Sequence, residues 1–112
     1  MLKIACYAKA LPLIFVFSAA WVTANENLYQ QQCSSCHGKD GSGNIALVAP
    51  AIAGLDASYL SRQLSHFKNG IRGSNPQDTS GMMMASMSKS LSREQIDSLA
   101  RYLAAQPFVS AK

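Results

Sequence analysis

The feature that most constrains this chain is the pentapeptide Cys33-Ser34-Ser35-Cys36-His37, which brings two thiols and an imidazole close together. Three kinds of site use two cysteines at this spacing: a structural zinc site, a disulfide or redox-active dithiol, and the attachment point of a c-type haem. Each kind of site requires different residues elsewhere in the chain. The rest of the sequence therefore helps to distinguish them.

The zinc and disulfide interpretations explain few of the other residues. A structural zinc site takes four ligands, usually as two separated pairs, and outside the pentapeptide the only further candidate after the N-terminal segment is His66. Adjacent Cys36 and His37 would also have difficulty sharing one tetrahedral ion. A thiol–disulfide site usually lies at a helix N-terminus within a βαβ pattern, whereas these cysteines end a helical pattern. A plain disulfide would leave His37 without a role.

Cys-x-x-Cys-His is the attachment signature of a c-type haem. Two thiols add to the two vinyl groups of the porphyrin, and the spacing of two residues matches those vinyls when the chain is helical. The histidine that follows is then the proximal axial ligand of the iron. The motif predicts one haem bound covalently through Cys33 and Cys36, with His37 on the iron.

The first 24 residues have the pattern of a secretory signal. Two lysines precede residues 10–22, an apolar run without charge that ends in the small-x-small sequence Val-Thr-Ala. A retained membrane anchor is the alternative, but the run falls short of the roughly 20 residues that a span requires. We expect residues 1–24 to be a cleaved signal peptide and residues 25–112 to form one periplasmic domain. Export is consistent with haem attachment, which occurs outside the cytoplasm.

The predicted mature domain is small and only mildly basic. Its hydrophobic core would be near the lower limit for independent stability, and such domains often need a disulfide, a metal or a cofactor. Without the two N-terminal lysines, eight Lys and Arg face six Asp and Glu. This excess is too small to indicate nucleic-acid binding. A haem would supply the additional core.

Three helical patterns are visible, with almost no strand signal. The first covers residues 25–37, with Asn25 as a possible cap. The second covers 56–70, and its apolar residues recur on one face. The third covers 91–106, beginning in an S-x-x-Q capping box. The segments between them, 38–55 and 71–90, are predicted to be irregular, and long loops in a small domain are usually functional.

Four methionines precede the last helix: Met82, Met83, Met84 and Met87. Methionine or histidine can fill the second axial position of a haem iron, although methionine also serves as adaptable core filler. Four methionines in a polar segment make an unusual core, so we expect one of them to bind the iron. His66 lies one position off the apolar face of its helix and is expected to be an ordinary helix histidine.

Three stretches together resemble a class I cytochrome c. In chain order they are CSSCHG, APAIAGLDASYLSRQLSHFKNGIRG and MMMASMSKSLSREQIDSLARYLAAQ. More narrowly, they are similar to one half of the periplasmic dihaem high-potential cytochromes c and to their monohaem relatives. The resemblance covers nearly all of residues 25–106. It implies an all-α class I cytochrome c fold, in which the N- and C-terminal helices cross and long loops wrap one covalently bound haem.

The resemblance also implies an axial methionine. In this family it usually stands seven residues before the leucine that opens the C-terminal helix. Counting back from Leu91 gives Met84, with Met83 as runner-up and Met87 as a residue that packs on the haem. If no methionine reached the iron, the haem would instead be a ligand-binding or catalytic one.

Further haem surroundings follow from the same resemblance. Pro50 matches a proline whose carbonyl accepts a hydrogen bond from the ligating histidine. Tyr59, Gln63 and Arg72 match positions near the haem or its propionates. Tyr29 and Tyr102 are expected where the first and last helices cross.

A haem iron with both axial positions filled has no open site for a substrate. The resemblance therefore implies an electron-transfer protein and not an enzyme, carrying single electrons in the periplasm between redox proteins that dock at the exposed haem edge. The alternative is a haem-bearing electron-transfer subunit of a larger oxidoreductase complex, for example with a flavoprotein. Neither nucleic acid nor stable membrane insertion after signal cleavage is expected.

Overall fold

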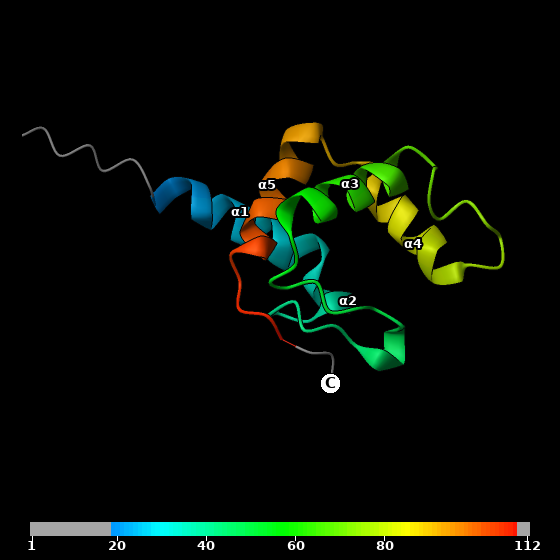
Figure 1. Ribbon diagram of the computed structural model, residues 1–112, viewed down its shortest axis with the longest axis horizontal. Coiled ribbons are helices and arrows are strands. Elements are labelled where there is room, and N and C mark those ends of the chain that lie inside the picture. The colour runs from blue at the N-terminus through cyan, green and yellow to red at the C-terminus, as the bar shows by residue number, and fades with distance from the viewer. Residues whose placement is uncertain (1–18, 110–112) are drawn as a thin grey trace, which may run out of the picture.

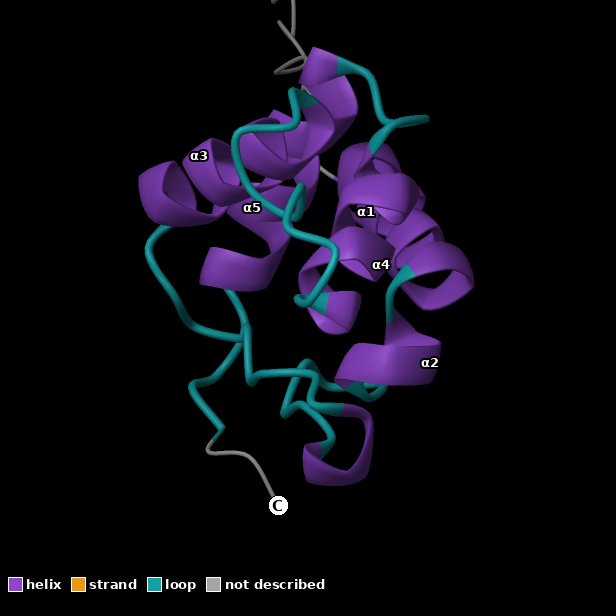
Figure 2. Ribbon diagram, turned by 90° about the vertical axis from the view of Figure 1, so that its right-hand side faces the viewer, coloured by secondary structure: helices purple, strands orange, loops and turns teal. Residues whose placement is uncertain are grey.

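The computed structural model describes residues 19–109, with side chains from residue 24 onward. The described part is helical (Figure 1), and Figure 2 contains no strand among the drawn residues. The elements in chain order are α1 (Ala19–Gln32), α2 (Ser34–His37), the 3-10 turn η1 (Ile45–Leu47), α3 (Ala57–Lys68), α4 (Thr79–Ser88) and α5 (Arg93–Ala104). Within residues 19–109, no helix has the length and apolar character that a bilayer span requires.

The first helix differs from its prediction at both ends. It begins at Ala19, so Asn25 lies inside α1 and is not its cap. The predicted single helix over residues 25–37 is divided, because α1 ends at Gln32 and the short α2 follows. Most of the predicted signal peptide, residues 1–18, lies outside the described residues.

The helix α3 follows its sequence pattern closely. The Asp56 carboxylate caps it by accepting a hydrogen bond from Tyr59 N at 2.9 Å. Leu60 and Phe67 are buried, as expected of its apolar face. The helix ends before Gly70, which has a φ of +71°.

The prediction of an irregular segment over residues 71–90 is wrong in its second half, where α4 forms. The Asp78 carboxylate caps this helix by accepting from Gly81 N at 2.8 Å. Methionine and alanine are good helix formers, and three small residues, Gly81, Ala85 and Ser88, form the buried face. The sequence did not predict this helix, because its buried face consists of small residues and carries no stripe of large apolar ones.

The helix α5 confirms the predicted capping box. Gln95 N donates to Ser92 Oγ at 3.1 Å, and Ser92 N donates to Gln95 Oε1 at 2.8 Å. The predicted stripe of this helix is fully buried, and its members are Ile96, Leu99, Ala100 and Leu103.

The core lies where α1, α3 and α5 meet, and Figure 1 shows α1 crossing α5. The Tyr29 and Tyr102 ring centroids are 5.8 Å apart at this crossing, which confirms the expected contact. The Tyr29 hydroxyl donates to Gly38 O at 2.6 Å, so the crossing is tied to the chain just after α2. Burial raises the pKa of Tyr29. The crossing thus forms a fixed base for the segment that carries the pentapeptide.

Candidate functional site

A cavity of about 880 Å³ lies beside the core, between the chain around α2 and η1 and the helices α3 and α4. Its volume is near the upper end of the range for small-molecule pockets, roughly 300–1,000 Å³. Apolar side chains supply most of the lining, including Leu47, Ile52, Leu64 and Phe67. The cavity is therefore suited to a large apolar group.

His37 is the buried polar group of this cavity. Its side chain is 6% exposed, and its Nδ1 lies 2.9 Å from Pro50 O. A carbonyl oxygen can only accept, so Nδ1 is the nitrogen that donates, and Nε2 is the nitrogen left to face a metal. An imidazole oriented in this way is a metal ligand whose ring position is fixed by its other nitrogen.

The loop after His37 holds the Pro50 carbonyl in place by close backbone contacts. Gly43 N donates to His37 O at 2.8 Å, and Ile52 N donates to Gly41 O at 2.8 Å. Gly43 has a φ of +83°, and a Cβ there would lie 2.6 Å from Ala51 N. Only glycine permits this approach. The predicted irregular segment is thus an ordered turn that positions one carbonyl against His37.

The two thiols have different surroundings. Cys36 lines the cavity, whereas Cys33 is partly buried and packs against the core. Burial, reinforced by the neighbouring Cys36, raises the pKa of Cys33 to about 11. Both thiols are free, so no disulfide joins them. Across the described part of the chain, no three or more Cys, His, Asp or Glu side chains are grouped to hold a metal ion.

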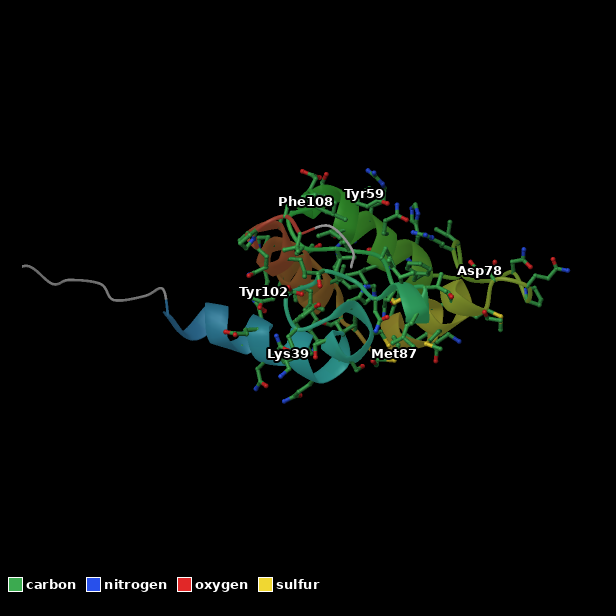
Figure 3. The ribbon with its side chains drawn as sticks, turned by 90° about the horizontal axis from the view of Figure 1, so that it is seen from below. Lys39, Tyr59, Asp78, Met87, Tyr102 and Phe108 are labelled. Atoms are coloured by element: carbon green, nitrogen blue, oxygen red, sulfur yellow. The ribbon has the colours of Figure 1, made fainter. Side chains whose placement is uncertain are left out.

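Helix α4 presents three of its four methionines to the cavity: Met83, Met84 and Met87 line it, and Met82 does not. Met83 is 60% exposed and Met87 is 45% exposed, whereas Met84 is half-buried. Figure 3 shows Met87 and Asp78 at opposite ends of this helix. Met84 is therefore the most enclosed methionine of the cavity wall.

The residues expected near the propionates also line the cavity. Arg72 Nη1 donates to Gln63 Oε1 at 2.7 Å, and its guanidinium carbon lies 4.5 Å from the centroid of the Phe67 ring. Tyr59 is 42% exposed, so it lies at the cavity wall and not in the core. His66 does not line the cavity.

The structure adds site residues that the sequence did not single out. Leu47 and Val48 line the cavity and are 52% and 71% exposed, so together with Met83 and Met87 they form an exposed apolar rim. Val48 has a φ of +55°, which is unusual for a β-branched residue and leaves no signal in the sequence. Asp78 also lines the cavity, and its position before a helix-forming run was the signal that could have found it.

A family model for cytochrome c matches residues 22–106. The chain belongs to the cytochrome c family. This assignment confirms the predicted covalently bound c-type haem, and the fold confirms the predicted all-α architecture of a class I cytochrome c. The cavity fits the group, because it combines a buried imidazole with a free Nε2, two unpaired thiols nearby and thioethers in its wall.

Curated relatives of this cytochrome include electron acceptors of another protein. The thiosulfate dehydrogenase electron acceptor of Stutzerimonas stutzeri (strain A1501) is 40% identical over 75 residues, covering 67% of this chain and 32% of the relative. The protein of the same name from Thiomonas intermedia (strain K12) is 33% identical over 102 residues, covering 91% and 43%. The chain thus spans less than half the length of these two relatives. Cytochrome c-554(548) of Halomonas halodenitrificans, 35% identical over 75 residues, is covered to 83%.

Two solved structures share the fold of this cytochrome. Reduced cytochrome c4 from Pseudomonas stutzeri has a TM-score of 0.65 and 27% identity, over 79% of this chain and 49% of that one. The thiosulfate dehydrogenase TsdBA from Marichromatium purpuratum has a TM-score of 0.68 and 29% identity, over 80% and 19%. In both cases this chain corresponds to a part of a longer protein.

Proposed function

We propose that this cytochrome carries single electrons between redox proteins through one haem, attached to Cys33 and Cys36 and ligated by His37 and Met84. The observation that carries the proposal is that a buried, oriented imidazole and an enclosed thioether line one cavity. The bound haem supplies a reversible one-electron iron couple. The protein residues determine whether the iron has an open coordination position and how high its reduction potential is.

Attachment uses the two thiols of the pentapeptide. Cys33 and Cys36 would each hold the haem through one thioether bond, formed by adding the S–H group across a vinyl group so that the hydrogen ends on the other vinyl carbon. The pentapeptide is coiled into one helical turn, in which His37 N donates to Cys33 O at 3.0 Å. This single turn keeps both thiols and the imidazole close to one another.

His37 and Met84 have complementary roles at the iron. The Pro50 carbonyl accepts a hydrogen bond from Nδ1 of His37, which orients the imidazole and increases its basicity. A thioether ligand and an apolar wall both favour the ferrous state and raise the reduction potential. With His37 and Met84 both holding the iron, a bound haem would have no open position for a substrate, and the protein would transfer electrons without making bonds.

The choice among the methionines is supported by burial on α4. Met82 does not line the cavity, and Met83 is 60% exposed. Met84 is half-buried and lines the cavity. Gln63 and Arg72, which hydrogen-bond to each other at the wall, are proposed to lie near the propionates, with Tyr59 beside them.

The protein is proposed to act in the periplasm after cleavage of residues 1–24. The positive start, the apolar run and the small-x-small end of this segment support export. Redox partners are proposed to dock on the exposed apolar rim of Leu47, Val48, Met83 and Met87, which lies at the cavity. Four side chains make a small contact surface, and small interfaces are typical of weak, transient electron-transfer complexes.

A second candidate function is that of a haem-bearing subunit of a larger oxidoreductase. It is favoured by the names of two relatives, each a thiosulfate dehydrogenase electron acceptor, and by the similarity to part of TsdBA. Affinity purification of the tagged, exported protein distinguishes the two. A partner retained at fixed stoichiometry through gel filtration supports a subunit, and a protein that purifies alone supports a free carrier.

Substitution of the methionines tests the ligand proposal. In the exported, haem-loaded protein, Met84→Ala is expected to abolish the ferric absorption band near the red end of the visible range and to lower the reduction potential. Met82→Ala is the matched control, because Met82 lies on the same helix but does not line the cavity. If Met84→Ala left the band and the potential unchanged, Met84 would not be the ligand.

A further inference from the structure

Neighbouring methionines make the rotation of α4 about its axis decisive for ligand choice. With 3.6 residues per turn, adjacent residues of a helix project about 100° apart. Rotation by one residue would therefore replace Met84 with Met83 or turn both away from the cavity. Both residues line the cavity in the observed orientation, but only Met84 is half-buried. Some contact must hold the helix in that orientation.

Large side chains do not provide this contact. The buried residues of α4 are small, Gly81, Ala85 and Ser88. A helix of this length is marginal by itself, since isolated helices below roughly 12–15 residues are rarely stable in water. The orientation of α4 therefore depends on how closely its backbone is held by its neighbours.

One such contact is made by Gly73, in the loop before α4. Its φ is +76°, and a Cβ at this position would overlap the Gly81 carbonyl oxygen. The same Cβ would lie 2.7 Å from the Gly81 carbonyl carbon and 3.0 Å from Ala85 Cβ. The Gly73 backbone is thus packed directly against the first turn of α4.

A second contact approaches Gly81 from Asp78. The Asp78 carboxylate accepts from Gly81 N at 2.8 Å, and it occupies the space where a Gly81 side chain would begin. A Cβ on Gly81 would overlap one carboxylate oxygen and lie 2.6 Å from Asp78 Cγ. Gly81 is therefore held between the backbone of Gly73 and the side chain of Asp78.

The other end of α4 is held by the burial of Ser88, which is 1% exposed, and by one hydrogen bond. Lys68 Nζ donates to Lys89 O at 2.9 Å, just after the last turn, and this bond is exposed. A single hydrogen bond from a flexible lysine restricts the position of the helix end more than its rotation. The contacts of α4 that are too close to admit even a methyl group are those at Gly73 and Gly81.

We propose that Gly73, Asp78 and Gly81, here called the α4 joint, fix the rotation of α4 and thereby select Met84 as the iron ligand over its neighbours. The joint residues position the ligand and do not bind the iron. This inference rests on the proposed ligation by Met84. Its specific content is that a change in the joint alters which methionine binds, without touching any methionine.

Two glycines of the same loop provide a matched test in the exported, haem-loaded protein. Gly70 and Gly73 have φ values of +71° and +76°, but a Cβ at Gly70 meets no atom within 4 Å. Gly70→Ala and Gly73→Ala therefore impose similar backbone strain, and only Gly73→Ala displaces α4. We expect Gly70→Ala to keep the red-edge band and the potential. Gly73→Ala should weaken or abolish the band and shift the potential.

Methionine substitutions in both backgrounds identify the ligand. In the Gly70→Ala protein, Met84→Ala should abolish the band. In the Gly73→Ala protein, Met84→Ala should have no further effect, and Met83→Ala should remove any band that remains. The inference is overturned if Gly73→Ala retains a full band that Met84→Ala still abolishes. Failure of the ligand proposal itself gives a different result, a band that survives Met84→Ala in the otherwise unmodified protein.

A second pair of variants covers the case in which Gly73→Ala yields no folded haem protein. Gly81→Ala places a methyl group in the Asp78 carboxylate and should weaken the band. Asp78→Ala removes the carboxylate that holds Gly81 N and should also weaken the band, with far-UV circular dichroism as the control for helix content. A full band in both variants, still abolished by Met84→Ala, would contradict the role of the joint.

Discussion

The helix crossing and the cavity wall are built in opposite ways. At the crossing, large side chains are almost completely buried: Tyr29 and Leu99 are each 1% exposed and Ile96 is 2% exposed. At the cavity wall, Leu47, Val48 and Met83 are between 52% and 71% exposed. The wall is held by glycine contacts, a helix cap and backbone hydrogen bonds.

This difference indicates where a bound haem would supply apolar contacts that protein side chains supply elsewhere. The crossing contains its own hydrophobic core, whereas the rim of the wall leaves Leu47, Val48 and Met83 more than half exposed. A haem would fill the cavity behind this rim and supply apolar contacts that the protein itself does not. The two regions should therefore respond differently to loss of the cofactor and to core substitutions.

The largest expected effect is that of removing both thiols. In a Cys33→Ser and Cys36→Ser double variant, covalent haem is lost, and we expect the amides of α4 and of residues 41–53 to lose most of their protection from hydrogen exchange. The α5 amides should keep more protection because their helix packs in the crossing. Ser35→Ala, which keeps both thiols, is the control. Equal loss of protection in the two regions would contradict the comparison.

Shortening a buried side chain at the helix crossing should lower the stability of the protein more than the same change at the cavity wall. Leu99→Ala is expected to reduce the free energy of unfolding by about 2–5 kcal/mol, because it leaves a cavity in a packed core. Leu47→Ala is the same change at the wall and should cost less. Denaturant unfolding of the two haem-loaded variants measures the difference. The comparison is wrong if the two losses are alike.

A substitution at Val48, whose backbone is strained, should increase the stability of the protein. Val48→Asn should increase the free energy of unfolding by about 1–2 kcal/mol, because asparagine tolerates the left-handed backbone that Val48 adopts. Ile45→Asn is the control, since Ile45 is similarly exposed, at 68%, but does not have a positive φ. Equal responses of the two variants in thermal unfolding would rule out strain at Val48.

The smallest effect concerns the start of α5. Ser92→Ala removes one half of the capping box and should lower the free energy of unfolding by about 1 kcal/mol. The red-edge band should be unchanged because Ser92 does not line the cavity. Ser90→Ala, just before the helix, controls for the loss of a serine. A lost band in Ser92→Ala would show that the two regions are more tightly coupled than described.

The crossing was predictable from the sequence because its signals are local. The capping box of Ser92 and Gln95 marks the start of α5, and its buried stripe follows the helical period. The pentapeptide likewise indicated the cofactor, since its residue types and spacing are tied to one chemistry. These patterns act within a few residues and do not depend on distant contacts.

The cavity wall was predicted less well because its order depends on close backbone contacts. Helix α4 buries small residues against Gly73, so no large apolar stripe marks it. The left-handed Val48 has no sequence signal, and the continuation of α1 to Ala19 crosses a segment interpreted as a cleavage site. Met84 followed only from the family resemblance, because four nearby methionines have equivalent local chemistry.

The most direct test of the central claim is an optical redox titration of the exported, haem-loaded protein, followed by addition of carbon monoxide to the reduced form. With both axial positions filled on a single haem, we expect one transition with a one-electron slope of about 59 mV per tenfold change in the ratio of oxidised to reduced protein. The reduced spectrum should not change with carbon monoxide. Two transitions, or a carbon monoxide complex that forms without any substitution, would contradict a closed, single-haem electron carrier.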